Sequence, residues 1–187
     1  MSATVSDLSV DEILGYVAAG AHHTLSPSLA VTQLDHALQT AALLAQRHPD
    51  DTELAVAGLV HDIGHLLPGG RDETHAADAA AAVRAALGER VAGIVGLHVE
   101  AKRYLVATEG DYGDVLSGDS VVSLDRQGGA LAAGEVAAFE ALPLATDAVL
   151  LRRADDQGKA DGLEVPGVDH WAPVLRKLAA EGTAGGN

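Results

Sequence analysis

The chain contains 187 residues, of which 12 are basic and 27 acidic, so its formal net charge is −15. Hydrophobic residues make up 48% of it, which excludes a disordered polyanion. The negative charge would repel nucleic-acid backbones and anionic membranes, so we expect neither as a partner. The absence of cysteine excludes disulfides, thiolate metal sites and a cysteine nucleophile. Nine histidines, against one Trp and one Phe, are the unusual part of the composition and direct the search for function.

The first part of the chain predicts five helices separated by stop signals. Ser9 and Glu12 have capping-box spacing and predict a helix that ends near Gly20. Proline ends the next helix at His48-Pro49, and Gly88 is typical of the residue that follows a helix. We expect these helices at residues 9–20, 27–48, 51–67, 74–87 and 89–106.

The rest of the chain predicts further helices around a looser middle stretch. Residues 107–131 are glycine-rich, with short helical turns expected at 112–116 and 120–126. Longer helices are expected at residues 133–142, 145–159 and 169–180. No alternating strand pattern or internal repeat is present, so the sequence predicts an all-α bundle of about eight helices. We expect one domain over residues 1–181 and a disordered tail over 182–187.

Neither a targeting segment nor a membrane span is predicted. The first twenty residues contain acidic residues but no Lys or Arg, which fits neither a secretory nor an organellar signal. No stretch of about 18 apolar residues is free of charge, so no transmembrane helix is expected. We therefore expect a cytoplasmic protein, either monomer or homodimer.

The segment His61-Asp-Ile-Gly-His65 ends an apolar helix. Its polar side chains would be costly to bury unless they coordinate a ligand or form hydrogen bonds. Adjacent residues of a helix point about 100° apart, so His61 and Asp62 reach one metal only at a helix end or through a bridging carboxylate. His65 lies four residues after His61 and shares its face on a continuous helix. We interpret this segment as part of a metal site.

Four other expected helices each carry a further candidate ligand: His36, His75, His98 and Asp155. Each residue alone is compatible with a surface or core position. Helical bundles build two-metal sites by bringing such N and O ligands from several helices to one centre. The set as a whole therefore favours a metal centre.

The order of these histidines and aspartates resembles the HD-domain superfamily of metal-dependent proteins. Longer segments, above all 98–105 and 127–129, are similar to the organophosphonate-degrading HD-domain oxygenases. That family includes 2-amino-1-hydroxyethylphosphonate oxygenase and is distantly related to myo-inositol oxygenase. The similarity covers about residues 30–175 and includes the segments 33–39, 124–129 and 152–156 with Lys159.

The resemblance implies an HD-domain helical core that holds two iron ions in the Fe(II)/Fe(III) state, with O2 as co-substrate. Asp155 rather than Asp156 is the implied ligand, because Lys159 follows it by four residues. Imidazole and carboxylate ligands without thiolate suit Fe, Mn or Zn. Asp62 would bridge the two ions, and the full set of implied ligands is His36, His61, Asp62, His75, His98 and Asp155.

The resemblance also implies a subsite for a small anionic substrate. Lys102 follows His98 by one helical turn and would point into the same pocket, where it supplies a compact positive charge. His65 is implied to contact the substrate during catalysis rather than to bind metal. Further implied substrate contacts are Ser120, Ser123, Gln127 and Arg152. The implied reaction is O2-dependent cleavage of the C–P bond of a small hydroxylated organophosphonate.

The segment before His36 departs from the pattern of this family. The family carries a Tyr that gates the iron and a Glu that reads the substrate amine, and the corresponding residues here are Ser26 and Leu29. We therefore expect a substrate that is altered at the end opposite its anionic group. His22 or His23 is a candidate lid ligand in place of the missing tyrosine.

Two other functions remain open from the sequence. An HD-domain phosphohydrolase would use metals such as Mn, Zn or Ni to activate water against a phosphate ester. A metal-stabilised binding or regulatory domain would show no turnover.

Overall fold

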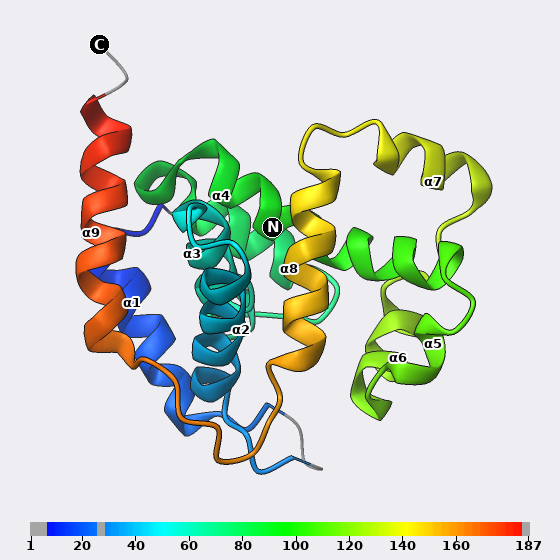
Figure 1. Ribbon diagram of the computed structural model, residues 1–187, viewed down its shortest axis with the longest axis horizontal. Helices are drawn as coiled ribbons and strands as arrows, with labels where there is room; N and C mark the ends of the chain where they lie inside the picture. Colours follow the sequence, from blue (N-terminus) through cyan, green and yellow to red (C-terminus); the bar gives the residue numbers. More distant parts are fainter. Residues whose placement is uncertain (1–6, 26–28, 185–187) are drawn as a thin grey trace.

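A computed structural model describes residues 7–25 and 29–184, and the order of its elements is shown in Figure 1. Within those residues it contains helices and one isolated bridge between Thr24 and Thr32. The helices are α1 (Val10–Ala19), η1 (Gly20–His22), α2 (Gln33–Arg47), α3 (Thr52–Val60), η2 (Ile63–His65), α4 (His75–Thr108), α5 (Tyr112–Val115), α6 (Gly118–Arg126), α7 (Ala133–Glu140), α8 (Ala145–Gln157) and α9 (Val168–Ala184). The predicted all-α class is confirmed.

Capping residues set where the early helices begin. Ser9 and Glu12 form the predicted capping box of α1. The prediction that the second helix begins near Pro27 is wrong: α2 begins at Gln33, because Thr32 and Asp35 form a second capping box there. The preceding chain is extended and pairs in the bridge at Thr24, while residues 26–28 lie outside the described part.

Gly88 divides the long element α4 into two helical arms. Its backbone has φ 87° and ψ 171°, a conformation that is almost restricted to glycine. The predicted boundary between the fourth and fifth helices at Gly88 is therefore confirmed. A straight helix would place His75 and His98 about 35 Å apart at 1.5 Å per residue, so the kink is what allows the two arms to converge.

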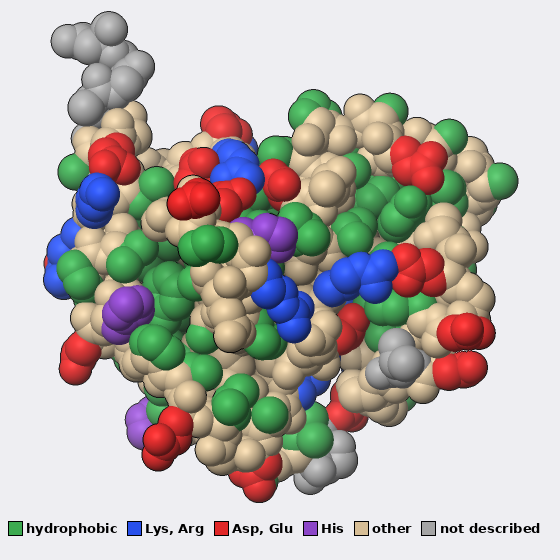
Figure 2. All heavy atoms as spheres, viewed as in Figure 1, with side chains coloured by type: hydrophobic (Ala, Val, Ile, Leu, Met, Phe, Trp, Pro, Cys, Tyr) green, Lys and Arg blue, Asp and Glu red, His purple; other side chains and the backbone are tan. Residues whose placement is uncertain are grey.

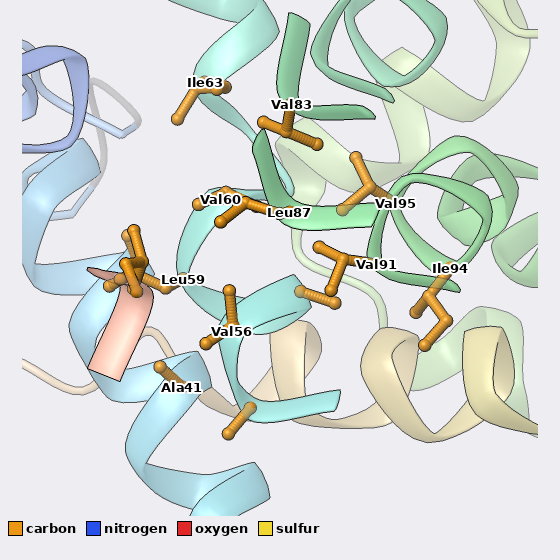
Figure 3. Close-up of a cluster of buried hydrophobic side chains, with 14 of the residues drawn as sticks. Ala41, Val56, Leu59, Val60, Ile63, Val83, Leu87, Val91, Ile94 and Val95 are labelled. Carbon is orange, nitrogen blue, oxygen red and sulfur yellow. The ribbon is translucent and has the colours of Figure 1, made fainter. Parts of the chain in front are cut away.

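The main core lies between α2, α3, α4 and α8, with α1 and α9 packed on one side. Figure 3 shows its centre, where Val56 and Val60 of α3 meet Leu87, Val91 and Val95 of α4. Each fully buried Val, Leu or Ile stabilises the fold by about 1.5–3 kcal/mol. This packing holds rigidly the helix ends that carry the histidines.

Helices α5, α6 and α7 lie together on the opposite side of α8 from α1 and α9 (Figure 1). Two small apolar clusters, one around Phe139 and one around Leu105, Tyr112 and Leu116, join them to α4 and α8. The short helical turns predicted in the middle stretch correspond to α5 and α6. Helix α9 continues to Ala184, past the expected start of the tail, and residues 185–187 lie outside the described part.

Acidic side chains are scattered over the face drawn in Figure 2, and at several places basic side chains lie beside them. Arg90, for example, pairs with Asp51, Glu53 and Asp147 and so joins α3, α4 and α8. None of the described helices combines the length and the apolar character needed to cross a bilayer.

Candidate metal centre and substrate cavity

Two pairs of histidine side chains meet inside the helical bundle. His36 Nε2 lies 3.2 Å from His61 Nε2, and His75 Nε2 lies 3.0 Å from His98 Nε2. All four side chains are buried. They come from α2, from the end of α3 and from the two arms of α4.

Asp62 faces both histidine pairs, one with each carboxylate oxygen. Its Oδ2 lies 3.7 Å from Nε2 of His36 and 3.6 Å from that of His61. Its Oδ1 lies 3.5 Å from Nε2 of His75 and 3.6 Å from that of His98. The residues form two groups that can hold a metal ion, a first ligand group of His36, His61 and Asp62 and a second of Asp62, His75 and His98. Because α3 ends at Val60, His61 and Asp62 reach this centre from a helix end.

The other ring nitrogen of each histidine bonds to the backbone. The Nδ1 atoms lie 2.7–2.8 Å from the carbonyl oxygens of Gly158, Gly58, Asp72 and Val95. A carbonyl can only accept, so each Nδ1 carries the hydrogen and the Nε2 of a neutral ring presents a lone pair to the centre. Facing lone pairs about 3 Å apart repel one another unless a cation lies near them. The donor set therefore fits metal ions.

The electrostatics favour the protonation states of metal ligands at Asp62 and at three of the histidines, whereas Asp155 raises the pKa of His36 in spite of its burial. Burial lowers the pKa of His61 and His75, and burial together with His75 and His61 lowers that of His98 well below its ordinary value. Burial alone would raise the pKa of Asp62, but the surrounding histidines, His61 above all, hold it well below its ordinary value. Neutral imidazoles and ionised carboxylates are the forms that bind metal.

Asp155 lies beside the first ligand group, as the resemblance implies. Its Oδ1 is 3.3 Å from His36 Nε2 and 3.4 Å from Lys159 Nζ, while its Oδ2 accepts a hydrogen bond from Arg152. Burial alone would raise the pKa of Asp155, but the charges of Arg152 and Lys159, together with the neighbouring histidines, hold it well below its ordinary value, so the carboxylate is ionised. Asp156 points to Arg152 and Tyr112 instead.

A cavity of about 440 Å³ opens onto this centre. It is lined by side chains from the segment before α2, from η2, α4, α6 and α8, and all the predicted substrate contacts are among them: His65, Lys102, Ser120, Ser123, Gln127 and Arg152. This volume suits a small ligand. The structure thus brings the predicted metal and substrate residues to one place.

Lys102 is the cation that α4 places in this cavity. Its ammonium group donates to Ser123 Oγ at 2.8 Å, and the side chain is only 3% exposed. Burial, with a smaller contribution from Arg152, lowers its pKa to about 8. Ser120, which is also buried, lies one turn before Ser123 on α6. This side of the cavity therefore offers a positive charge and hydroxyl groups to an anion.

The other predicted contacts have partners of their own. Gln127 Nε2 donates to the carbonyl oxygen of Asp72, while its Oε1 is buried without a hydrogen-bond partner in the structure. The His65 ring stacks on His75 with centroids 4.0 Å apart, and its Nε2 lies 3.9 Å from Asp62 Oδ1. His65 makes these contacts from η2. The prediction of one continuous helix through His61–His65 is wrong, because α3 ends at Val60.

The lid candidates differ in position. His23 lines the cavity and is exposed, and His22 is exposed as well but does not line it. Leu29 lines the cavity, whereas Ser26 lies outside the described residues.

Sequence reasoning did not single out Asp72, Arg126 and Tyr112, although each contacts the site. Arg126 bonds Asp72, whose carbonyl oxygen holds both His75 and Gln127. The sequence offers one signal for each of the first two residues. Asp72 lies three residues before His75, and Arg126 lies next to Gln127.

Comparison with known proteins supports the family indicated by these residues. The family model described as HD domain matches residues 34–156. The chain belongs to the HD-domain family. All the proposed ligands and most of the cavity lie within the matched residues.

Among HD-domain proteins, this chain is similar to phosphonate dioxygenases. It is 40% identical over 151 residues to hydroxymethylphosphonate dioxygenase of Gimesia maris, covering 76% of this chain and 75% of that protein. It is 34% identical over 156 residues to the glycine-betaine-forming [1-hydroxy-2-(trimethylamino)ethyl]phosphonate dioxygenase of Leisingera caerulea, covering 79% of each. It is also 30% identical to uncharacterized protein L432 of Acanthamoeba polyphaga mimivirus over 81% of this chain and 74% of that protein.

Proposed function

We propose that this protein is a diiron dioxygenase that uses O2 to cleave the C–P bond of a small 1-hydroxyalkylphosphonate. The observation that carries this proposal is the Asp62 carboxylate, whose two oxygens face two separate histidine pairs. The similarity to two phosphonate dioxygenases supports it, since a hydrolase would need no such likeness.

His36, His61, Asp62 and Asp155 would hold one iron, and Asp62, His75 and His98 the other. When bound, the pair of irons supplies the electrons and open positions that O2 activation requires. The carbonyl oxygens behind the Nδ1 atoms orient the rings, and burial of the four histidines keeps bulk water from the reacting atoms.

Lys102 and Ser123 would bind the phosphonate group. Below pH 8 the Lys102 ammonium is mainly charged, and its position on α4 places it one turn from His98, so an anion bound to it lies next to the second ligand group. Gln127 and Ser120 line the same cavity and add polar groups to it. His65 lines the same cavity and lies beside Asp62, where it can hold a substrate proton.

The opposite part of the cavity favours a substrate with a small neutral end. The described lining residues from the segment before α2 and from its first turn are His23, Thr24, Leu25, Leu29 and Gln33, with no carboxylate and no Phe, Tyr or Trp among them. A quaternary ammonium group is recognised by aromatic faces or by opposite charge. We therefore infer that hydroxymethylphosphonate is a better substrate than its trimethylaminoethyl counterpart.

The test is O2 uptake by protein purified without oxygen and loaded with ferrous iron. We expect hydroxymethylphosphonate to release phosphate only when O2 is present, with one O2 consumed for each phosphate. The balanced products are one formate and one phosphate, because one oxygen atom of O2 is added to the carbon and the other to the phosphorus. Chromatography detects the formate. Phosphate release from phosphate esters under argon, with no O2 uptake from any hydroxyalkylphosphonate, would contradict the proposal and indicate a phosphohydrolase.

A further inference from the structure

Arg152 is fixed by hydrogen bonds on three sides. Its Nε donates to Tyr112 Oη at 3.1 Å, its Nη1 to Asp155 and its Nη2 to Asp156. The Tyr112 hydroxyl donates in turn to the other oxygen of Asp156, which closes the network. Arg152 and Tyr112 are 5% and 6% exposed, so solvent competes little for these bonds.

The network joins two separate parts of the fold. Arg152, Asp155 and Asp156 lie on α8, whereas Tyr112 is the first residue of α5. The Tyr112 ring packs in an apolar cluster with Leu105 and Leu116, which fixes the direction of its hydroxyl. Helix α6, which follows directly, carries Ser120 and Ser123 of the proposed anion site.

Arg152 decides which Asp155 oxygen faces the metal centre. It occupies Oδ2, and this leaves Oδ1 directed to His36 Nε2 at 3.3 Å. An arginine free to rotate could pull the whole carboxylate away from the first ligand group. Asp156 and Tyr112 prevent this rotation because they accept hydrogen bonds from its Nη2 and Nε.

We propose that Tyr112 is a positioning residue that, with Asp156, holds Arg152 so that the Asp155 carboxylate completes the first ligand group. The inference rests on the proposed function only in taking Asp155 as a ligand. The inference predicts that loss of Tyr112 affects the two metal positions unequally. Tyr112 reaches only the His36 side of the centre, so its loss weakens one metal position and leaves the one formed by Asp62, His75 and His98.

The test is anaerobic equilibrium dialysis of Fe(II) against the full chain and its Tyr112→Phe variant, with metal counted per chain. Removing the partner of an oriented ligand typically costs about 10- to 100-fold in metal affinity. We expect one Fe(II) to bind as in the wild type and the other about 10-fold more weakly. The matched control is Tyr104→Phe, because its hydroxyl bonds Glu140 at the surface and its ring contacts the same apolar cluster.

A second variant, Asp156→Asn, breaks the charge pair with Arg152 without altering the Tyr112 ring, and it serves if Tyr112→Phe fails to fold. We expect the same selective weakening. Equal weakening at both positions, or unchanged binding at both in either folded variant, would overturn the inference. O2 uptake by the wild-type protein tests the proposed function separately, so the two failures are distinguishable.

Discussion

The single residue Lys102 predicts how activity depends on pH. Burial lowers its pKa to about 8, so the ammonium is charged below that pH and loses its charge above it. Since a dianionic phosphonate needs that charge, we expect kcat/KM for hydroxymethylphosphonate to fall as the pH rises through about 8. A pH–rate profile from 6 to 9.5 measures this.

Lys102→Met removes the charge at every pH. A hydrogen bond to a charged group contributes about 1.5–3 kcal/mol, so kcat/KM at pH 7 should fall about 10- to 100-fold and the alkaline decrease should disappear. Lys177→Met, at an exposed lysine of α9, is the control and should keep the wild-type profile. An alkaline decrease that persists in Lys102→Met would assign it to another group.

At the scale of elements, the end of α8 is packed directly on α2. The carbonyl oxygen of Gly158 accepts from His36 Nδ1 at 2.7 Å, and a Cβ added at Gly158 would lie 2.5 Å from Thr40 Oγ1. Its φ of −76° suits any residue, so glycine is required here by the close approach alone. Gly158→Ala should move this carbonyl and weaken the first ligand group about 10-fold, as measured by Fe(II) dialysis. Adding Thr40→Ala should restore part of the affinity, and no change in Gly158→Ala would show that the contact is not needed.

The kink in α4 also depends on a single glycine, Gly88. Alanine at Gly88 would have to adopt the glycine backbone conformation, at a cost of about 1–3 kcal/mol. In a chain of this length each kcal/mol lost from the free energy of unfolding lowers Tm by about 2–4 °C. We therefore expect Gly88→Ala to melt several degrees below the wild type. Gly15→Ala is the control, because a Cβ there meets nothing within 4 Å and α1 is regular at that position. Equal Tm values for Gly88→Ala and the wild type would contradict the assigned strain.

At the scale of the whole molecule, the metal centre connects helices that are far apart in sequence. It takes side chains from α2, the end of α3, both arms of α4 and α8, so a bound metal stabilises the entire bundle. A ligand present at 100 times its Kd adds about 2.7 kcal/mol to the free energy of unfolding.

We therefore expect Fe(II) to raise the Tm of chelator-treated protein by about 5–10 °C, measured anaerobically by circular dichroism. Asp62→Ala should abolish this rise, because both ligand groups share that carboxylate. Asp161→Ala, at an exposed carboxylate, should keep it. A metal-dependent rise that survives Asp62→Ala would show that the ions bind elsewhere.

Most helices and the chemical character of the site could be predicted from the sequence. Apolar spacing, the capping box at Ser9 and the break at Gly88 are local signals, and local signals fix where helices begin and end. Nine histidines are unusual in this cysteine-free chain, and the order of four of them with Asp62 and Asp155 indicated a metal centre. The start of α2 was predicted at Pro27 rather than at Gln33. Proline is the stronger sequence signal for a helix start, whereas the cap that forms is at Thr32.

How these residues act together depends on contacts between helices that are far apart in sequence. The two oxygens of Asp62 face different histidine pairs because the kinked arms of α4 return to the end of α3, over separations in sequence that no local pattern encodes. Likewise, Tyr112 stands in a glycine-rich stretch and has no motif of its own. Its role follows from the packing of α5 against α8, which brings its hydroxyl to Arg152 across 40 residues of chain.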